Sequence, residues 1–114
     1  MDNQKGKVIL LNSEGCGTGD NELGFSILVA LIENLATREE RPIAIVCWNT
    51  AVKLLAKDSP LISRLKDLEE KGISILAGKL CVEELGLTNY IVVGKVVTMD
   101  AILDLLLHNN VVTV

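Results

Sequence analysis

Three cysteines are the residues of this 114-residue chain that are best suited to chemistry. Cys16 lies in a glycine-rich segment, Cys47 ends an apolar run, and Cys81 follows another apolar run. An odd number of cysteines without a Cys-x-x-Cys pair is typical of a reducing compartment rather than of a disulfide framework. We therefore expect free thiols and a cytoplasmic location.

Cys81 stands in the segment AGKLCVEELGL, at the start of a short predicted helix. The free amide groups of a helix's first turn favour a thiolate, and Lys79 adds positive charge nearby. The negative charges of Glu83 and Glu84 disfavour the Cys81 thiolate. This position favours a reactive thiol, whereas Cys47 is most simply a buried strand residue that packs like a small hydrophobe.

The glycine-rich segment, SEGCGTGDNELG (13–24), has alternating glycines at Gly15, Gly17 and Gly19. Such a loop permits positive φ angles or a close approach of backbone to a ligand. Its spacing matches neither the phosphate loop nor the dinucleotide-binding motif, and its acidic residues would repel a phosphate. The simplest interpretation is a tight turn whose acids complement the dipole of the following helix, with Cys16 as an incidental loop residue.

Metal and Cys-His chemistry receive little support from the sequence. The single histidine, His108, is expected near the end of the last helix and at the opposite edge from Cys81. No cysteines or histidines have the spacing of a zinc site. Three cysteines on one edge leave a soft-metal site as a minor alternative, but we predict no metal and no cofactor.

Short apolar runs alternate with helical patterns along the whole chain. Runs rich in Val and Ile predict five strands, at 7–12, 42–48, 73–77, 90–94 and 111–114. Helical patterns lie at 20–37, 50–57, 59–72 and 98–110. This alternation predicts one α/β domain over residues 1–114, with parallel strands and helices on both faces. Ligands of such sheets bind beyond the carboxyl ends of the strands, where all three cysteines are expected.

The helices also have predicted caps and faces. The N-cap residues are Asp20, Thr50, Ser59 and Thr98, and Pro60 is expected at the first position of its helix. In the first helix, a spacing of three to four residues puts one set of apolar side chains on one face: Leu23, Ile27, Ala30, Leu31 and Leu35.

The composition narrows the class of protein. Apolar residues make up 49% and aromatic residues 3%, so aliphatic side chains must fill a buried parallel sheet. The same excess raises the expectation of apolar surface between subunits. A net charge of -4 without a basic block argues against nucleic acid or an anionic membrane as partner. No apolar stretch reaches the roughly 18 residues of a membrane span, and the first residues lack the pattern of a signal peptide.

Three stretches resemble the DsrE/DsrF-like family, in particular the YedF-type branch linked with selenium metabolism. They are NSEGCGTGDNELG, then WNTAVKLLAKDSPLISRLKDLEEKGISILA, then CVEELGL followed by VGKVVTMDAILDLL. The resemblance covers nearly the whole chain, about residues 7–110. The resemblance implies a three-layer α/β/α sandwich with a mostly parallel five-stranded sheet, flavodoxin-like in appearance. It also implies a homo-oligomer, either a trimer or a hexamer.

The resemblance further implies a sulfurtransferase or sulfur carrier. Family members pass sulfane sulfur as a cysteine persulfide between a donor and an acceptor protein, such as a TusA-like carrier. By position, Cys81 would carry the sulfur or selenium, with Gly78 and Lys79 beside it, and the glycine loop and Asn49 would wall the pocket. Gly78 replaces the first cysteine of the branch's Cys-x-x-Cys pair, and the branch's N-terminal TusA-type domain is not seen here. Cys16 would be a second thiol if the loops meet.

A second hypothesis keeps the fold without sulfur transfer. The protein would then be a non-catalytic small-molecule-binding or oligomeric scaffold protein, with a pocket formed by Gly15, Gly17, Gly19, Asn49 and Cys81. The two hypotheses differ in what they require of the cysteine. A carrier needs a solvent-reachable Cys81, whereas a scaffold tolerates Cys81→Ser.

Overall fold

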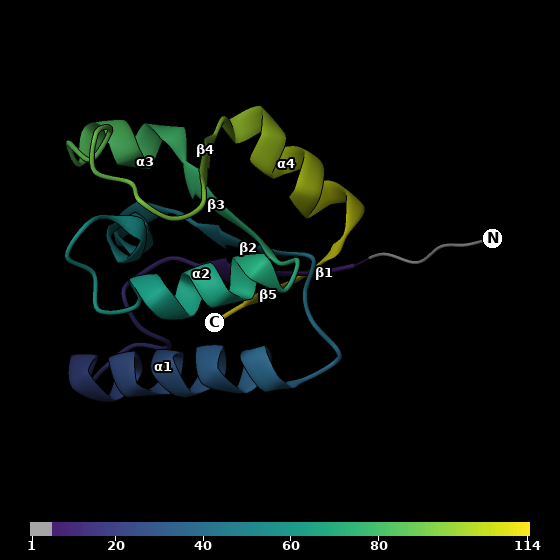
Figure 1. Ribbon diagram of the computed structural model, residues 1–114. Helices are drawn as coiled ribbons and strands as arrows, with labels where there is room; N and C mark the ends of the chain where they lie inside the picture. The colour runs from purple at the N-terminus through teal and green to yellow at the C-terminus, as the bar shows by residue number, and fades with distance from the viewer. Residues whose placement is uncertain (1–5) are drawn as a thin grey trace.

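The protein, described by a computed structural model over residues 6–114, contains a five-stranded parallel sheet with helices on both faces (Figure 1). The strands follow the order β4-β3-β2-β1-β5, and every neighbouring pair is parallel. Their bounds are β1 Lys7–Leu11, β2 Ala44–Cys47, β3 Ser74–Gly78, β4 Lys95–Val97 and β5 Asn110–Thr113. The helices are α1 Asn21–Thr37, the 3-10 helix η1 Asn49–Leu55, α2 Ile62–Glu70, α3 Lys79–Glu84 and α4 Met99–His108. The predicted α/β/α sandwich is confirmed.

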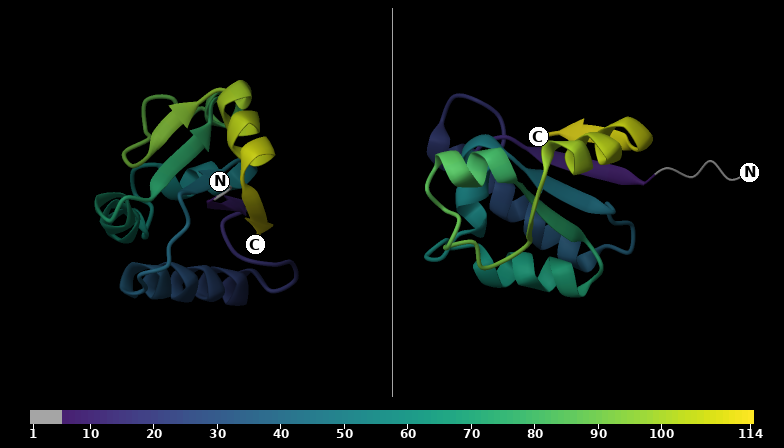
Figure 2. Two further views of the ribbon diagram at one scale, coloured as in Figure 1. Left: turned by 90° about the vertical axis from the view of Figure 1, so that its right-hand side faces the viewer. Right: turned by 90° about the horizontal axis from the view of Figure 1, so that it is seen from above.

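Alternate side chains of the central strands enter two separate cores. Ile9, Ile45 and Ile75 pack in the larger core, on the side of α1 and α2. Val8 and Val46 pack in the smaller core on the other face, beneath α4. The views in Figure 2 show this division, with α1 and α4 on opposite sides of the sheet. Because the central strands are covered on both faces, they appear in the sequence as continuous apolar runs.

The helices that follow the neighbouring strands β3 and β4 pack on opposite faces of the sheet. Val82, in the helix that follows β3, belongs to the larger core, whereas Ile102, in the helix that follows β4, belongs to the smaller core. The chain therefore leaves these two neighbouring strands toward opposite faces. A crevice at such a switch point is where open α/β sheets bind ligands.

The predicted fourth strand, 90–94, is wrong. The strand that joins the sheet is β4, which begins after Gly94, and the predicted segment pairs elsewhere. Ile91 forms an isolated antiparallel bridge with Ala56, just beyond the end of η1. Within this run Val93 is buried, whereas Tyr90 and Val92 are 46% and 45% exposed, so the apolar run predicted neither the strand nor its burial.

The side of α1 that faces the sheet also differs from the predicted face. Its buried residues are Gly24, Leu28 and Ile32. Leu23 and Ile27, which were grouped on the apolar face, are 58% and 45% exposed. The helix docks through Gly24 because the preceding loop crosses it closely, with the Cys16 N–H donating to the Gly24 carbonyl over 2.9 Å. A glycine leaves room for this crossing, which hydrophobic periodicity does not reveal.

Two of the four predicted caps are confirmed. Asp20 and Thr98 accept backbone N–H groups of α1 and α4 over 2.9 and 3.3 Å. Thr50 is not a cap, because it lies inside η1, which starts one residue earlier without a side-chain cap. The Ser59 hydroxyl accepts the Leu61 N–H over 3.2 Å, but α2 begins only at the next residue, so Pro60 does not open the helix.

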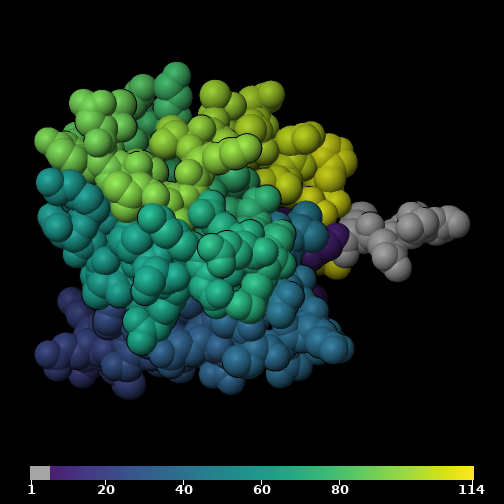
Figure 3. Space-filling model, viewed as in Figure 1, coloured from purple at the N-terminus to yellow at the C-terminus, as the bar shows by residue number. Residues whose placement is uncertain are grey.

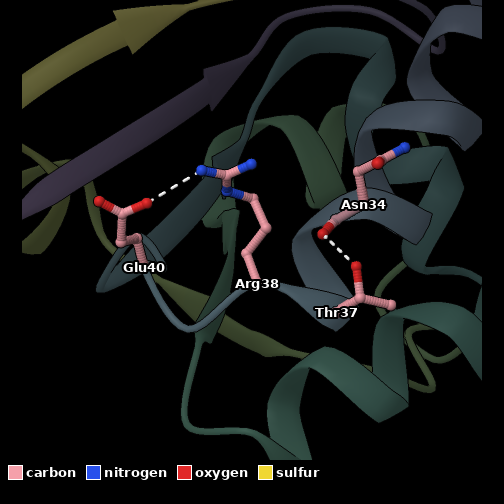
Figure 4. A network of polar contacts seen from close by, with 4 residues as sticks. All are labelled: Asn34, Thr37, Arg38 and Glu40. Carbon is pink, nitrogen blue, oxygen red and sulfur yellow. Dashed lines mark hydrogen bonds and ion pairs between the residues drawn. The ribbon is translucent and has the colours of Figure 1, made fainter.

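Polar contacts close the C-terminal end of α1 (Figure 4). The Thr37 hydroxyl donates to the Asn34 carbonyl over 3.1 Å, and Arg38 pairs with Glu40 over 2.9 Å. Both members of the ion pair are mostly exposed, so it contributes at most about 1 kcal/mol. The space-filling view shows α1 packed along one side of the molecule and α4 along the opposite side (Figure 3). No helix in the described part of the chain has the length and apolar character needed to cross a membrane.

Candidate functional site

Cys81 lies at the crevice between β3 and β4. β3 ends at Gly78, and Cys81 is the third residue of the six-residue helix α3 that follows directly. Met99 opens α4 after β4 and lines the same cavity as the cysteine. The topology therefore brings the carboxyl ends of two neighbouring strands together around one thiol.

The backbone of Asn49 contacts the sulfur of Cys81. The Asn49 N–H donates to Cys81 Sγ over 3.0 Å. This amide is free for the sulfur because the first backbone bond of η1 runs from the Ala51 N–H to the Trp48 carbonyl. Asn49 has a φ of 54°, a left-handed conformation that asparagine adopts more readily than most residues. The turn at the end of β2 therefore directs a backbone donor toward the next strand's cysteine.

An open cavity of about 440 Å³ borders the sulfur. Its lining consists of Trp48, Asn49, Leu80, Cys81, Glu84, Leu85 and Met99. Gly78 packs behind the sulfur, where an added Cβ would lie 3.6 Å from Cys81 Sγ, the Trp48 Cβ and Ile102 Cδ1. Cys81 is half-buried, so its thiol is reachable from a cavity with mostly apolar walls.

The other two thiols are buried. Cys47 is 0% exposed and Cys16 is 9% exposed, and both belong to the larger core. Burial raises the pKa of Cys47 to about 12 and also raises the pKa of Cys16. Both are therefore protonated and poorly reactive at neutral pH. The interpretation of Cys47 as a buried strand residue is confirmed, and Cys16 is a buried part of its loop.

The glycine loop does not line the Cys81 cavity. Gly15 and Gly17 border a separate cavity of about 400 Å³, together with acidic residues and Thr50. Gly19 lines neither cavity, and its φ of +117° shows that it serves the turn. Lys79 is exposed at the start of α3 and lines neither cavity. Of the predicted site residues, the structure groups Asn49, Gly78 and Cys81 and separates Gly15, Cys16, Gly17, Gly19 and Lys79 from the cavity.

Five lining residues were not predicted as site residues from the sequence: Trp48, Leu80, Glu84, Leu85 and Met99. Trp48 carries a detectable signal, because it is the only tryptophan and stands directly after a strand at the expected edge. Leu80 and Leu85 flank the cysteine but resemble core residues of a helix. Met99 was out of reach because the strand before it was misplaced.

Metal and histidine chemistry find no support at this edge. In residues 6–114, no three or more His, Cys, Asp or Glu side chains are grouped so that they could hold a metal ion. His108 ends α4, with Nδ1 2.7 Å from the Asp104 carbonyl oxygen and 3.3 Å from its carboxylate. Because Met99 begins that helix beside the cavity, His108 lies at its far end.

Comparison with known proteins shows the fold and no more. The sequence matches no protein-family model and no curated protein. Three solved structures are similar over nearly their full length. MTH1491 from Methanobacterium thermoautotrophicum has a TM-score of 0.72 and 18% identity, and covers 95% of this chain and 97% of its own. BT1422 from Bacteroides thetaiotaomicron has a TM-score of 0.68 and 25% sequence identity, and the match covers 95% of this chain and 94% of BT1422. The ychN protein from E. coli has a TM-score of 0.73 and 18% sequence identity, and the match covers 97% of this chain and 100% of the ychN chain. The first two are described as proteins of unknown function.

Proposed function

We propose that this protein is a sulfur carrier of the DsrE-like kind, which holds sulfane sulfur, or selenium, as a persulfide on Cys81. One observation carries the proposal: the Asn49 N–H donates to Cys81 Sγ over 3.0 Å at the wall of an open apolar cavity. The burial of Cys16 and Cys47 supports the choice of this thiol over the other two. The resemblance of the three sequence stretches supports the family, and the free thiols favour a reducing, cytoplasmic setting.

The transfer consists of two thiol exchanges. The Cys81 thiolate attacks the outer sulfur of a donor persulfide, R–S–SH. A bond forms between Sγ and the outer sulfur, the donor's S–S bond breaks, and the donor leaves as R–S⁻. An acceptor thiolate then attacks the outer sulfur of Cys81–S–SH and displaces the Cys81 thiolate. Each step moves one sulfur atom and exchanges one S–S bond for another, so no external oxidant or reductant is required.

The geometry suits the second step in particular. When the acceptor attacks, negative charge returns to Sγ, and the Asn49 N–H is placed to hydrogen-bond that leaving sulfur. The apolar walls of the cavity reduce contact between the bound persulfide and water. Because Cys16 is buried in the core, the acceptor thiol must come from another molecule, which we propose to be a TusA-like carrier.

We also propose that the protein forms a homo-oligomer, a trimer or a hexamer. The edge strand β5 leaves Val111 and Val112 38% and 41% exposed, and α1 leaves Leu23 and Ile27 exposed. Exposed apolar residues on an unpaired strand edge favour association with another chain. Sedimentation velocity of the purified protein tests the subunit count, and a monomer at all concentrations would contradict it.

Intact-mass spectrometry after incubation with glutathione persulfide tests the carrier function. The wild type and Cys16→Ser are expected to gain about 32 Da, the mass of one sulfur atom, and Cys81→Ser is expected to gain none. A transfer assay then follows the loss of that mass on adding a thiol acceptor. Circular dichroism of each variant checks that it is folded.

The opposite result would favour the second hypothesis. If the wild type gains no sulfur and Cys81 is alkylated no faster than a buried thiol, the cavity is a binding site without turnover. Cys81→Ser would then leave the protein's assembly and ligand binding unchanged.

A further inference from the structure

The edge of the sheet that holds the Cys81 cavity is acidic as a whole. We define the carboxyl-edge surface as segments 13–22, 48–58, 79–90 and 98–100, which follow the carboxyl ends of β1 to β4. These segments carry seven Asp and Glu residues, all exposed, against three lysines. Three of the seven, Glu14, Asp20 and Glu22, lie in segment 13–22, which borders the neighbouring cavity. The excess equals the net charge of -4 of the whole chain, so the negative charge is concentrated at this edge.

The centre of this surface is apolar. Leu80, Met99 and Leu85 line the Cys81 cavity and are 63%, 49% and 40% exposed. Glu84 lines the same cavity, and Glu83 is its exposed neighbour on α3. An exposed apolar patch with a polar rim is typical of a protein contact site. Aliphatic side chains at a cavity mouth suit a partner's apolar side chain, which would also remove water from the sulfur.

We propose, as a deepening of the carrier function, that the carboxyl-edge surface docks a basic protein partner. The partner inserts an apolar side chain into the cavity and presents its own thiol or persulfide to Cys81. Opposite charges on the two rims raise the rate of encounter and orient the partner before the thiol exchange. The charge complementarity identifies the partner as a protein with a positively charged surface around its reactive cysteine.

Other occupants of this surface are disfavoured by the same charges. Nucleic acids and anionic membranes are negatively charged and are repelled. A second copy of this chain would bring the same acidic rim face to face with the first. Like charges across an interface cost affinity, so self-association through this surface is disfavoured.

Thiol exchange with activated peptides tests the docking surface. Three peptides of equal length carry one cysteine as a mixed disulfide with thionitrobenzoate, flanked by leucine and lysine, by leucine and glutamate, or by serine and lysine. Attack of the Cys81 thiolate forms the Cys81–peptide disulfide and releases coloured thionitrobenzoate. The leucine–lysine peptide is expected to react at least about fivefold faster than either other peptide at about 10 mM salt. Its advantage over the leucine–glutamate peptide is expected to fall below about twofold at about 0.5 M salt, where charges are screened.

Two double variants that each remove two carboxylates show which part of the surface produces the preference for the lysine peptide. Glu83→Gln with Glu84→Gln removes two carboxylates beside the cavity and is expected to lower the preference for lysine over glutamate at least about threefold. Glu39→Gln with Glu70→Gln removes two exposed carboxylates near the opposite edge of the sheet and is expected to leave the preference unchanged. Equal rates for all three peptides, or equal effects of the two double variants, would overturn the docking proposal.

The outcome is separable from that of the carrier function. If glutathione persulfide transfers sulfur to Cys81 but peptide exchange ignores charge, the carrier stands and the docking surface does not. If exchange depends on charge but no persulfide forms, the surface stands and its chemistry is not sulfur transfer.

Discussion

The Asn49 amide and the Cys81 sulfur lie 3.0 Å apart although 32 residues separate them in the chain. Their meeting depends on two neighbouring parallel strands, since Asn49 follows the end of β2 and Cys81 follows the end of β3. The turn that contains the left-handed Asn49 therefore supplies a backbone hydrogen-bond donor to the Cys81 sulfur.

The left-handed conformation of Asn49 predicts opposite results for two substitutions. Asn49→Gly removes an exposed side chain but keeps the turn and the amide, so stability and the rate of persulfide formation should stay within about twofold of wild type. Asn49→Val places a β-branched residue at a φ of 54° and should cost roughly 1–2 kcal/mol. If the turn relaxes and the hydrogen bond is lost, the rate should fall about tenfold.

Urea denaturation and timed intact-mass spectra of the two Asn49 variants provide the measurements. Equal stability and equal rates for Asn49→Val and wild type would show that the turn contributes nothing to the site.

The burial of two cysteines predicts selective reaction of the third. In the folded protein, one thiol should react rapidly with Ellman's reagent, and all three should react in denaturant. Folded Cys81→Ser should show no rapid reaction, because Cys16 and Cys47 react only when the structure opens. Two rapid thiols in the native wild type would contradict the described burial.

Cys47 predicts a loss of stability at alkaline pH. Its pKa is about 12 in the folded protein against 9.0 for the ordinary thiol, so the unfolded chain releases this proton first. The stabilising contribution is complete below about pH 9 and is lost as the pH rises toward 12. Between about pH 8 and about pH 10.5, wild type should lose roughly 2 kcal/mol more unfolding free energy than Cys47→Ala.

Denaturant titrations of both proteins at each pH measure this difference. The comparison cancels the contributions of all groups that the two proteins share. Parallel stability curves would show that Cys47 is not buried as a neutral thiol.

Two glycines with positive φ form a matched pair for testing the entry into β4. A Cβ at Gly94 would lie 2.8 Å from the Ile75 carbonyl oxygen, so Gly94→Ala should cost about 2–4 kcal/mol from clash and strain together. Gly86 has a φ of +70° but open space around the added atom, so Gly86→Ala should cost only about 1 kcal/mol. Urea midpoints at unchanged m-value measure both. Equal costs would contradict the close packing of Gly94 against β3.

The order of the layers and the edge that holds the site were predictable from the sequence. Apolar runs and capped helical patterns are local features, and their alternation leaves few arrangements other than parallel strands with crossover helices. In such an arrangement every strand ends at the same edge, so Cys81 and Asn49 were expected there together.

The tertiary structure alone decided which loops share the cavity. The glycine loop and Cys81 follow strands of the same sheet, but the crevice forms between β3 and β4, where the helices leave toward opposite faces. Met99 therefore joins the cysteine, and Gly15 and Gly17 border another cavity.

The same limit explains the misplaced strand and the misjudged face of α1. Hydrophobic periodicity suggests which segments are buried, but contacts between distant parts of the chain decide which side chains are covered and by what. Ile91 pairs with Ala56 rather than with a strand of the sheet. Gly24 is buried in α1 because the preceding loop crosses the helix at this residue. The amino-acid sequence thus predicted a parallel sheet and singled out Cys81 as the candidate thiol, and packing between remote segments decided what surrounds that thiol.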